Sequence, residues 1–174
     1  TFADTVSLNI LEGTLAMGGG NVPATGSTTI TLGDLTTAGT LKITDATAAS
    51  TIRPIALNEG GGKVEIADLA GLLTFAGPIT GDGISTLTKT GPGTLALSGA
   101  NTYFGPTVIN GGTLRVASSI ASSSSVTVNA GGKFEAAKSQ TINALTITDG
   151  GKVVVVATTP PAAKNVLTLI GDSP

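Results

Sequence analysis

A short motif recurs through the whole chain: a glycine followed by a run in which polar and apolar residues alternate. Seven copies begin at Gly13, Gly39, Gly62, Gly93, Gly112, Gly132 and Gly151. Successive glycines are separated by 26, 23, 31, 19, 20 and 19 residues, with a mean of 23, and a shorter eighth copy begins at Val166. Because a unit of this size cannot bury an apolar face by itself, each copy must stack on its neighbours.

Within each copy the alternation has the period of a β-strand. After Gly112, the side chains of Leu114 and Val116 fall on one side and those of Thr113 and Arg115 on the other. Threonine and valine favour strands because a branched Cβ packs well on a pleated surface. Glycine permits a sharp bend, and abundant glycine and threonine both disfavour a continuous helix. The sequence therefore predicts an all-β chain of short strands.

Two architectures accommodate such strands. In a parallel β-solenoid each copy forms one coil, whereas in an antiparallel sandwich or barrel the strands pair as hairpins with turns about every 8–12 residues. The solenoid is favoured because the similarity recurs at the coil period, and because small residues at the corners suit close stacking. We expect one β-solenoid domain over residues 1–174, with about seven to eight coils that each rise about 4.8 Å.

The residue inventory excludes several kinds of chemistry. The chain has no histidine and no cysteine, so the usual catalytic triads and thiol nucleophiles cannot form. Its nine basic residues are spread singly and aromatics make up only 3%, which argues against a nucleic-acid partner. No apolar run approaches the roughly 18 residues that a membrane span needs. We predict no catalytic residue, no cofactor and no metal site.

Several polar motifs are better explained by structure than by function. Gly81-Asp82-Gly83 resembles a calcium-binding repeat, but one copy cannot supply about six to eight oxygen ligands, so it is predicted to form a turn. Ser98 and the serines at 122–125 lack a neighbouring base. Tyr103 and Phe104 are adjacent aromatics, and they are predicted to pack at a coil corner rather than to form a platform for sugars.

Charged residues share one position of the repeat. The position is occupied in successive copies by Ala16, Lys42, Glu65, Ala96, Arg115, Glu135 and Val154. We expect a solvated ladder of alternating charge there, in which each exposed pair contributes little to stability. The alternative is a hydrolase with paired carboxylates, which would need Glu65 and Glu135 to lie close together.

Residues 73–116 carry the most specific pattern. They include LTKTGPGTLALSGANTY at 87–103 and GPTVINGGTLRV at 105–116. This stretch resembles the autotransporter-associated β-strand repeat, or passenger-associated transport repeat, of bacterial secreted proteins. The resemblance implies a right-handed parallel β-helix that is displayed outside a bacterial cell.

The two ends of the stack suggest a function based on shape. Residues 4–10 and 166–170 are alternating strands without a visible cap, and unpaired strand edges favour pairing with another strand. Head-to-tail pairing of this kind does not close and so generates filaments. The predicted joining edges are Val6, Leu8, Ile10, Val166, Leu167 and Leu169.

The leading prediction is therefore a non-enzymatic, extracellular structural protein of a bacterium that stacks end to end into a cell-surface filament. Its predicted partner is a second copy of itself, besides a host or surface ligand. An alternative is a stalk fragment of an autotransporter-type passenger or adhesin, in which neighbouring coils continue both ends covalently. A polysaccharide-degrading β-helix enzyme is a third interpretation, and the residue inventory disfavours it.

Overall fold

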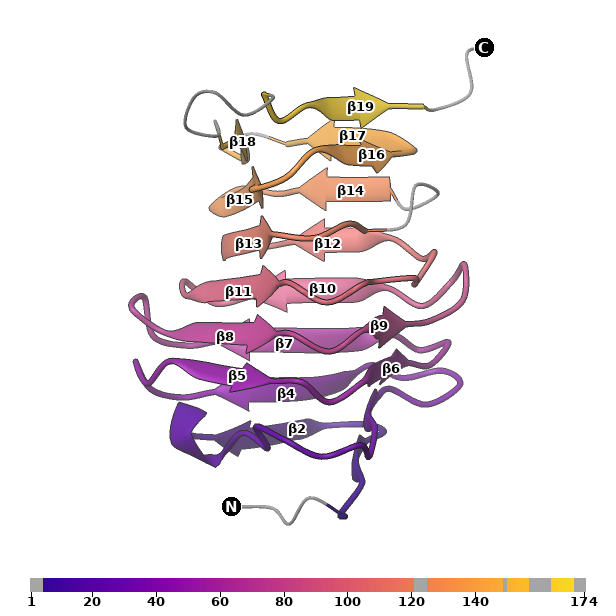
Figure 1. Cartoon of the computed structure of the whole chain (residues 1–174), viewed down its shortest axis with the longest axis vertical. Coiled ribbons are helices and arrows are strands. Elements are labelled where there is room, and N and C mark those ends of the chain that lie inside the picture. The colour runs from indigo at the N-terminus through magenta and orange to yellow at the C-terminus, as the bar shows by residue number, and fades with distance from the viewer. Residues whose placement is uncertain (1–4, 121–124, 149, 157–163, 171–174) are drawn as a thin grey trace.

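The chain winds into a stack of coils whose axis runs vertically in Figure 1. The computed structural model describes residues 5–120, 125–148, 150–156 and 164–170. Within them, every strand pairs in parallel with a strand of a neighbouring coil, on one side at the ends of a sheet and on both sides elsewhere. Parallel pairing between consecutive coils confirms the β-solenoid and excludes the sandwich and barrel.

Three sides of the stack carry the sheets. The seven-stranded sheet contains β2 (Thr14–Met17), β4 (Gly39–Ile43), β7 (Gly62–Ile66), β10 (Leu87–Thr90), β12 (Thr107–Ile109), β14 (Ser125–Val128) and β17 (Ala144–Ile147). The six-stranded sheet contains β5 (Ala49–Thr51), β8 (Leu72–Phe75), β11 (Thr94–Leu97), β13 (Gly112–Val116), β15 (Gly132–Ala136) and β18 (Lys152–Val155). The third side contains β1 (Leu8–Ile10), β3 (Ile30–Leu32), β6 (Ile55–Leu57) and β9 (Ile79–Thr80), and then the pair β16 (Gln140–Ile142) and β19 (Leu167–Leu169). A short 3₁₀ turn, η1 (Gly19–Asn21), follows β2.

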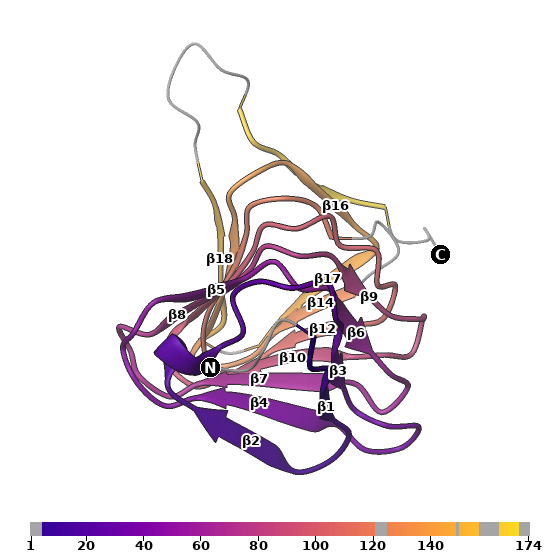
Figure 2. The same ribbon diagram turned by 60° about the horizontal axis from the view of Figure 1, so that its bottom comes forward.

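The coil is right-handed. In Figure 1 the six-stranded sheet runs rightward across the front, and the seven-stranded sheet runs leftward behind it as the chain climbs. Figure 2, seen more from below, separates the same two sheets and shows the third side between them. This is the hand that parallel strands with crossover connections almost always adopt.

The number of turns is slightly smaller than the predicted seven to eight coils. The seven strands from β2 to β17 span six turns. The repeat glycines do not all mark the same side, because Gly39 and Gly62 begin strands of the seven-stranded sheet whereas Gly112 and Gly132 begin strands of the six-stranded sheet. The gap of 31 residues between Gly62 and Gly93 therefore covers more than one full turn.

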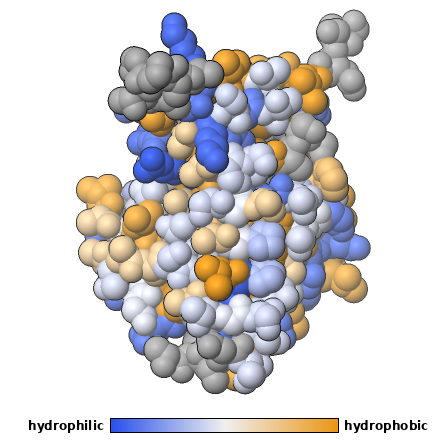
Figure 3. Space-filling view, viewed as in Figure 1, coloured by the Kyte–Doolittle hydropathy of each residue, from blue (hydrophilic) through white to orange (hydrophobic). Residues whose placement is uncertain are grey.

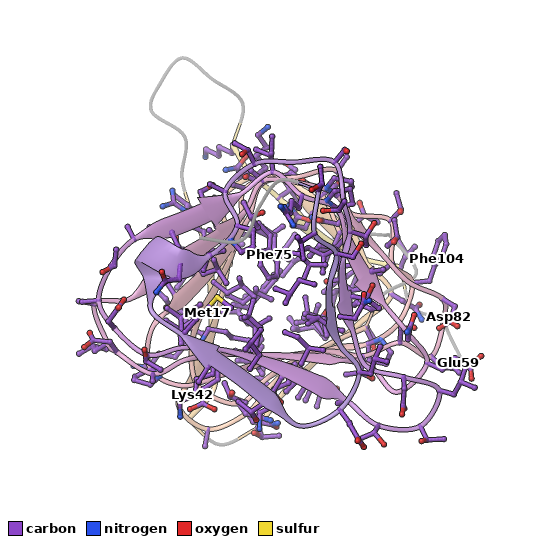
Figure 4. The ribbon with its side chains drawn as sticks, turned by 90° about the horizontal axis from the view of Figure 1, so that it is seen from below. Met17, Lys42, Glu59, Phe75, Asp82 and Phe104 are labelled. Atoms are coloured by element: carbon purple, nitrogen blue, oxygen red, sulfur yellow. The ribbon has the colours of Figure 1, made fainter. Side chains whose placement is uncertain are left out.

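The core consists of apolar columns that run along the axis. Alternate residues of each strand point inward, as in β8, where Leu73 and Phe75 are fully buried. The strand register aligns similar residues of successive coils, so that Leu73, Leu95 and Leu114 lie directly above one another. Figure 4 looks along the axis and shows Met17 and Phe75 pointing into the interior, whereas Lys42 points outward.

Side-chain amides replace strand pairing on the third side between β9 and β16. Asn101 accepts a hydrogen bond from the Ile79 amide at 3.3 Å and donates to the Ser119 carbonyl at 3.0 Å. Gln140 accepts from the Ile120 amide at 3.2 Å in the same way. Both side-chain amides are almost fully buried. They satisfy the hydrogen bonds of backbone groups where this side has no paired strands. No helix in the described part of the chain is long and apolar enough to cross a membrane.

Candidate functional site

At the amino-terminal joining edge the inward side chains are covered. Strand β1 pairs with β3 along one edge, and its inward residues Leu8 and Ile10 are only 7% and 5% exposed. Val6 precedes the strand and is 45% exposed. Its carbonyl oxygen already accepts hydrogen bonds from the Arg53 guanidinium at 2.7 Å and from the Thr28 hydroxyl at 3.0 Å. Asp4, which the sequence analysis included in this edge, lies outside the described residues.

Arg53 is a buried charge that the sequence analysis did not identify. Its side chain is fully buried, and Nε donates to the Thr25 carbonyl at 2.6 Å. Alternation supplies a signal for it, because Thr51, Arg53 and Ile55 share the inward side of the chain. The guanidinium thereby ties its own coil to the two coils below, since Thr25 precedes β3 and Val6 precedes β1.

The carboxyl-terminal edge is open. Strand β19 pairs with β16, and Val166 and Leu169 are each 54% exposed, whereas Leu167 is half-buried. In the same end coils the inward residues Ile147 and Val155 are 50% and 38% exposed. The apolar columns therefore reach the surface at this end, while at the other end they are covered.

The predicted charge ladder is split over two sheets. Lys42 lies beside Glu65 in the seven-stranded sheet with Nζ–Oε1 at 2.7 Å, and Arg115 lies beside Glu135 in the six-stranded sheet with Nε–Oε1 at 3.3 Å. Alternating charges in neighbouring coils do form ion pairs, as predicted. A single ladder is wrong, because the repeat changes sides between Gly62 and Gly93. Glu65 and Glu135 consequently do not meet as a carboxylate pair.

The acidic motif at Asp82 forms a turn, as predicted. Its carboxylate accepts hydrogen bonds from the Ile84 and Ser85 amides at 3.1 and 3.0 Å and from the Ser85 hydroxyl at 2.6 Å. These donors, chiefly the Ser85 hydroxyl, lower the pKa of Asp82 below its usual value. In the described residues no three acidic, histidine or cysteine side chains cluster as metal ligands.

The two adjacent aromatics have different environments. Tyr103 is fully buried, and its hydroxyl lies 2.8 Å from the Thr107 hydroxyl. Burial raises the pKa of Tyr103 to about 12. The prediction of corner packing is confirmed for Tyr103 and wrong for Phe104, which is 55% exposed and points outward on the same side as Asp82 in Figure 4.

A second buried cation, Lys89, occupies a core column. It lies between Val64 and Ile109 in register and is fully buried. Its ammonium group donates to the carbonyl oxygens of Thr90 at 2.7 Å, Gly91 at 2.8 Å and Gly111 at 3.2 Å. Burial lowers the pKa of Lys89 to about 8, against an opposing attraction to Glu65.

A shallow groove crosses the outer surface of the six-stranded sheet. It has a volume of about 490 Å³, and its floor is made of short side chains that include Thr74, Ala96 and Ser98. Ser98 lies on this surface with no histidine anywhere in the chain to activate it. Leu69 flanks the groove and Arg115 lines it as well.

Comparison with known proteins connects this fold to a family. Residues 87–116, which run from β10 to the end of β13, match the family model described as Passenger-associated-transport-repeat. Over 81 residues the chain is 42% identical to the Adhesin BmaC autotransporter of Brucella suis biovar 1 (strain 1330). The aligned part covers 47% of this chain and 2% of that adhesin, so the chain corresponds to a small part of this relative. No solved structure matches the chain.

Proposed function

The chain carries a passenger-associated transport repeat on a β-solenoid, and from this we propose that it is a stalk segment of an autotransporter-type passenger or adhesin. Such a segment is displayed at or outside the surface of a bacterial cell, and its role is structural and not enzymatic. Similarity to a small part of a much longer adhesin supports the stalk over the self-assembling filament. In a stalk, neighbouring coils of the same polypeptide continue the stack.

The observation that carries the proposal is the open carboxyl-terminal end of the core. Ile147, Val155 and Leu169 are 38–54% exposed, whereas their column neighbours Val128, Ala136 and Ile142 are fully buried. Covering these side chains with one more coil would stabilise each by about 1 kcal/mol, half of the value for full burial. A further coil in register supplies this cover and also pairs the free edge of β19.

A filament subunit is the second candidate function. The observation in its favour is that β1 and β19 each pair along one edge only among the described residues. The free edge of one copy could then receive the end strand of another by strand addition. The covered core at the amino-terminal end, where Leu8 and Ile10 are only 7% and 5% exposed, weakens this alternative.

Sedimentation velocity and negative-stain electron microscopy at high concentration separate the two functions. The stalk predicts a monomer for the chain alone. It also predicts greater stability, without association, when residues 143–169 are duplicated in tandem to add one coil, because an added coil interface contributes stability. The stalk proposal would be overturned if the wild-type chain formed regular fibres and if Leu8→Lys or Leu169→Lys abolished them. Leu69→Lys is the matched control, because Leu69 is 78% exposed on the side of the stack.

The structural role has a separate test. The purified chain should release no reducing ends from neutral or acidic polysaccharides above a blank without protein. If the chain did release reducing ends and Glu135→Gln abolished this activity, the hydrolase interpretation would be supported. The same substitution at Glu65 serves as the control, since Glu65 lies on a different sheet.

A further inference from the structure

A hollow lies on the side of the solenoid, where the seven-stranded sheet turns into the six-stranded sheet. Its volume is about 350 Å³. Leu69 and Pro92 line it together with Thr113, Lys133 and Lys152, and the rest of its wall is glycine. The hollow opens on the side of the stack, although its Lys152 belongs to β18 in the end coil. An inference about this hollow goes beyond the proposed stalk and does not depend on it.

The hollow forms because the corners of successive coils differ in length. Five residues, 67–71, join β7 to β8, and Leu69 at their centre is 78% exposed. Only Asn110 and Gly111 join β12 to β13, and three residues join β14 to β15. The positive φ of Gly131 (79°) allows such a tight turn, which a side chain would strain. The long corner projects beside the short ones and leaves a step between them.

Two lysines line this step with like charges. Lys133 and Lys152 are direct neighbours in register on β15 and β18, and like charges in this position repel each other. Glu135 faces Lys133 at 2.9 Å and Arg115 at 3.3 Å, so one carboxylate serves two cations. In the part of the chain that the structure describes, Lys152 has no ion pair. Figure 3 shows hydrophilic side chains gathered over this upper part of the six-stranded sheet.

We propose that this hollow binds an acidic polysaccharide. An anionic group of the sugar chain lies between the ammonium groups of Lys133 and Lys152, where it relieves their repulsion and accepts charge-assisted hydrogen bonds. Sugar rings further along the polymer, about three coil spacings of ~4.8 Å away, pack their C–H groups on Leu69 and Pro92. Nucleic acid is disfavoured because no aromatic side chain lines the hollow for base stacking. A flat lipid surface is disfavoured because the hollow lies in a step beside the projecting corner.

The proposal is tested by calorimetric titration of the intact chain at low salt. The ligands are polygalacturonate, which carries only carboxylates, dextran sulfate, which carries only sulfates, and neutral dextran. We expect binding to one or both acidic polymers and none to dextran, and the tighter ligand identifies the anionic group. Lys133→Gln with Lys152→Gln should weaken binding at least about tenfold, since each charge-assisted bond contributes more than 1 kcal/mol.

Control variants separate a site from a general charge effect. Lys63→Gln with Lys164→Gln removes the same charge elsewhere and should leave the affinity unchanged. Glu135→Gln should strengthen binding, because it frees Lys133 and Arg115. Thermal melts of each variant establish that it folds, and Lys133→Arg with Lys152→Arg should retain binding. The proposal is overturned by no binding to either polymer, by equal losses in the two double variants, or by equally tight binding of single-stranded DNA.

Discussion

Lys89 allows the energetics of the core to be tested through pH. It is fully buried in an apolar column, and burial lowers its pKa from 10.5 to about 8. Between these two pH values the Lys89 ammonium therefore stays protonated in the unfolded chain and is largely deprotonated in the folded chain. Since the unfolded state binds more protons there, stability rises with pH between about 8 and 10.5. The full rise is about 3 kcal/mol, from 1.36 kcal/mol per pKa unit.

The perturbation is Lys89→Met, which keeps an unbranched side chain in the column and removes the titrating group. Urea unfolding followed by circular dichroism, at a series of pH values from 7 to 10, gives the free energy of unfolding of each protein. Wild type should gain stability relative to Lys89→Met as pH rises through this range. Lys63→Met retains Lys89 and should follow the wild-type curve. Parallel curves for wild type and Lys89→Met would refute the assignment of the lowered pKa to this burial.

Three further predictions concern packing, a buried hydrogen bond and an ion pair. An added Cβ at Gly99 would overlap a backbone carbonyl of the preceding coil, whereas none lies within 4 Å of Gly83. Gly99→Ala should therefore lower the free energy of unfolding by about 3 kcal/mol or more, and Gly83→Ala should change it by less than about 1 kcal/mol. Equal urea midpoints for the two variants would contradict the close stacking of coils at Gly99. Tyr103→Phe should cost about 1–3 kcal/mol by leaving a buried hydroxyl partner unsatisfied, and an unchanged melting temperature would argue against that bond. A double-mutant cycle on Lys42 and Glu65, whose side chains are 34% and 27% exposed, should give a coupling below about 1 kcal/mol that falls with salt; a larger, salt-insensitive value would contradict it.

Alternation and spacing predicted much of the fold. The parity of residues after each glycine identified inward side chains such as Leu114 and Val116, and both are fully buried. The shared position of Arg115 and Glu135 predicted their contact across neighbouring coils. These features could be found because strand parity and coil period are local properties that repeat along the chain.

The side of the stack that each copy occupies could not be found in this way. A coil with three strands allows the same motif to begin on either long sheet, and spacing alone does not distinguish them. The repeat changes sides between Gly62 and Gly93, and for that reason the predicted single ladder was wrong. The two buried cations were also missed, because a charged residue at an inward position is ordinarily a reason to place it outside.

The sequence by itself favoured a stack of short parallel strands, since the similarity recurs at the coil period and so small a repeating unit must stack on its neighbours to bury an apolar face. Tertiary structure decided where its charges go. Lys89 is held by the Gly111 carbonyl, which is 22 residues away in the chain, and Arg53 by the Val6 carbonyl, 47 residues away. The step beside Lys133 likewise arises from corners of unequal length in different coils. Such sites exist only after coils have stacked, because their atoms come from segments that no local pattern relates.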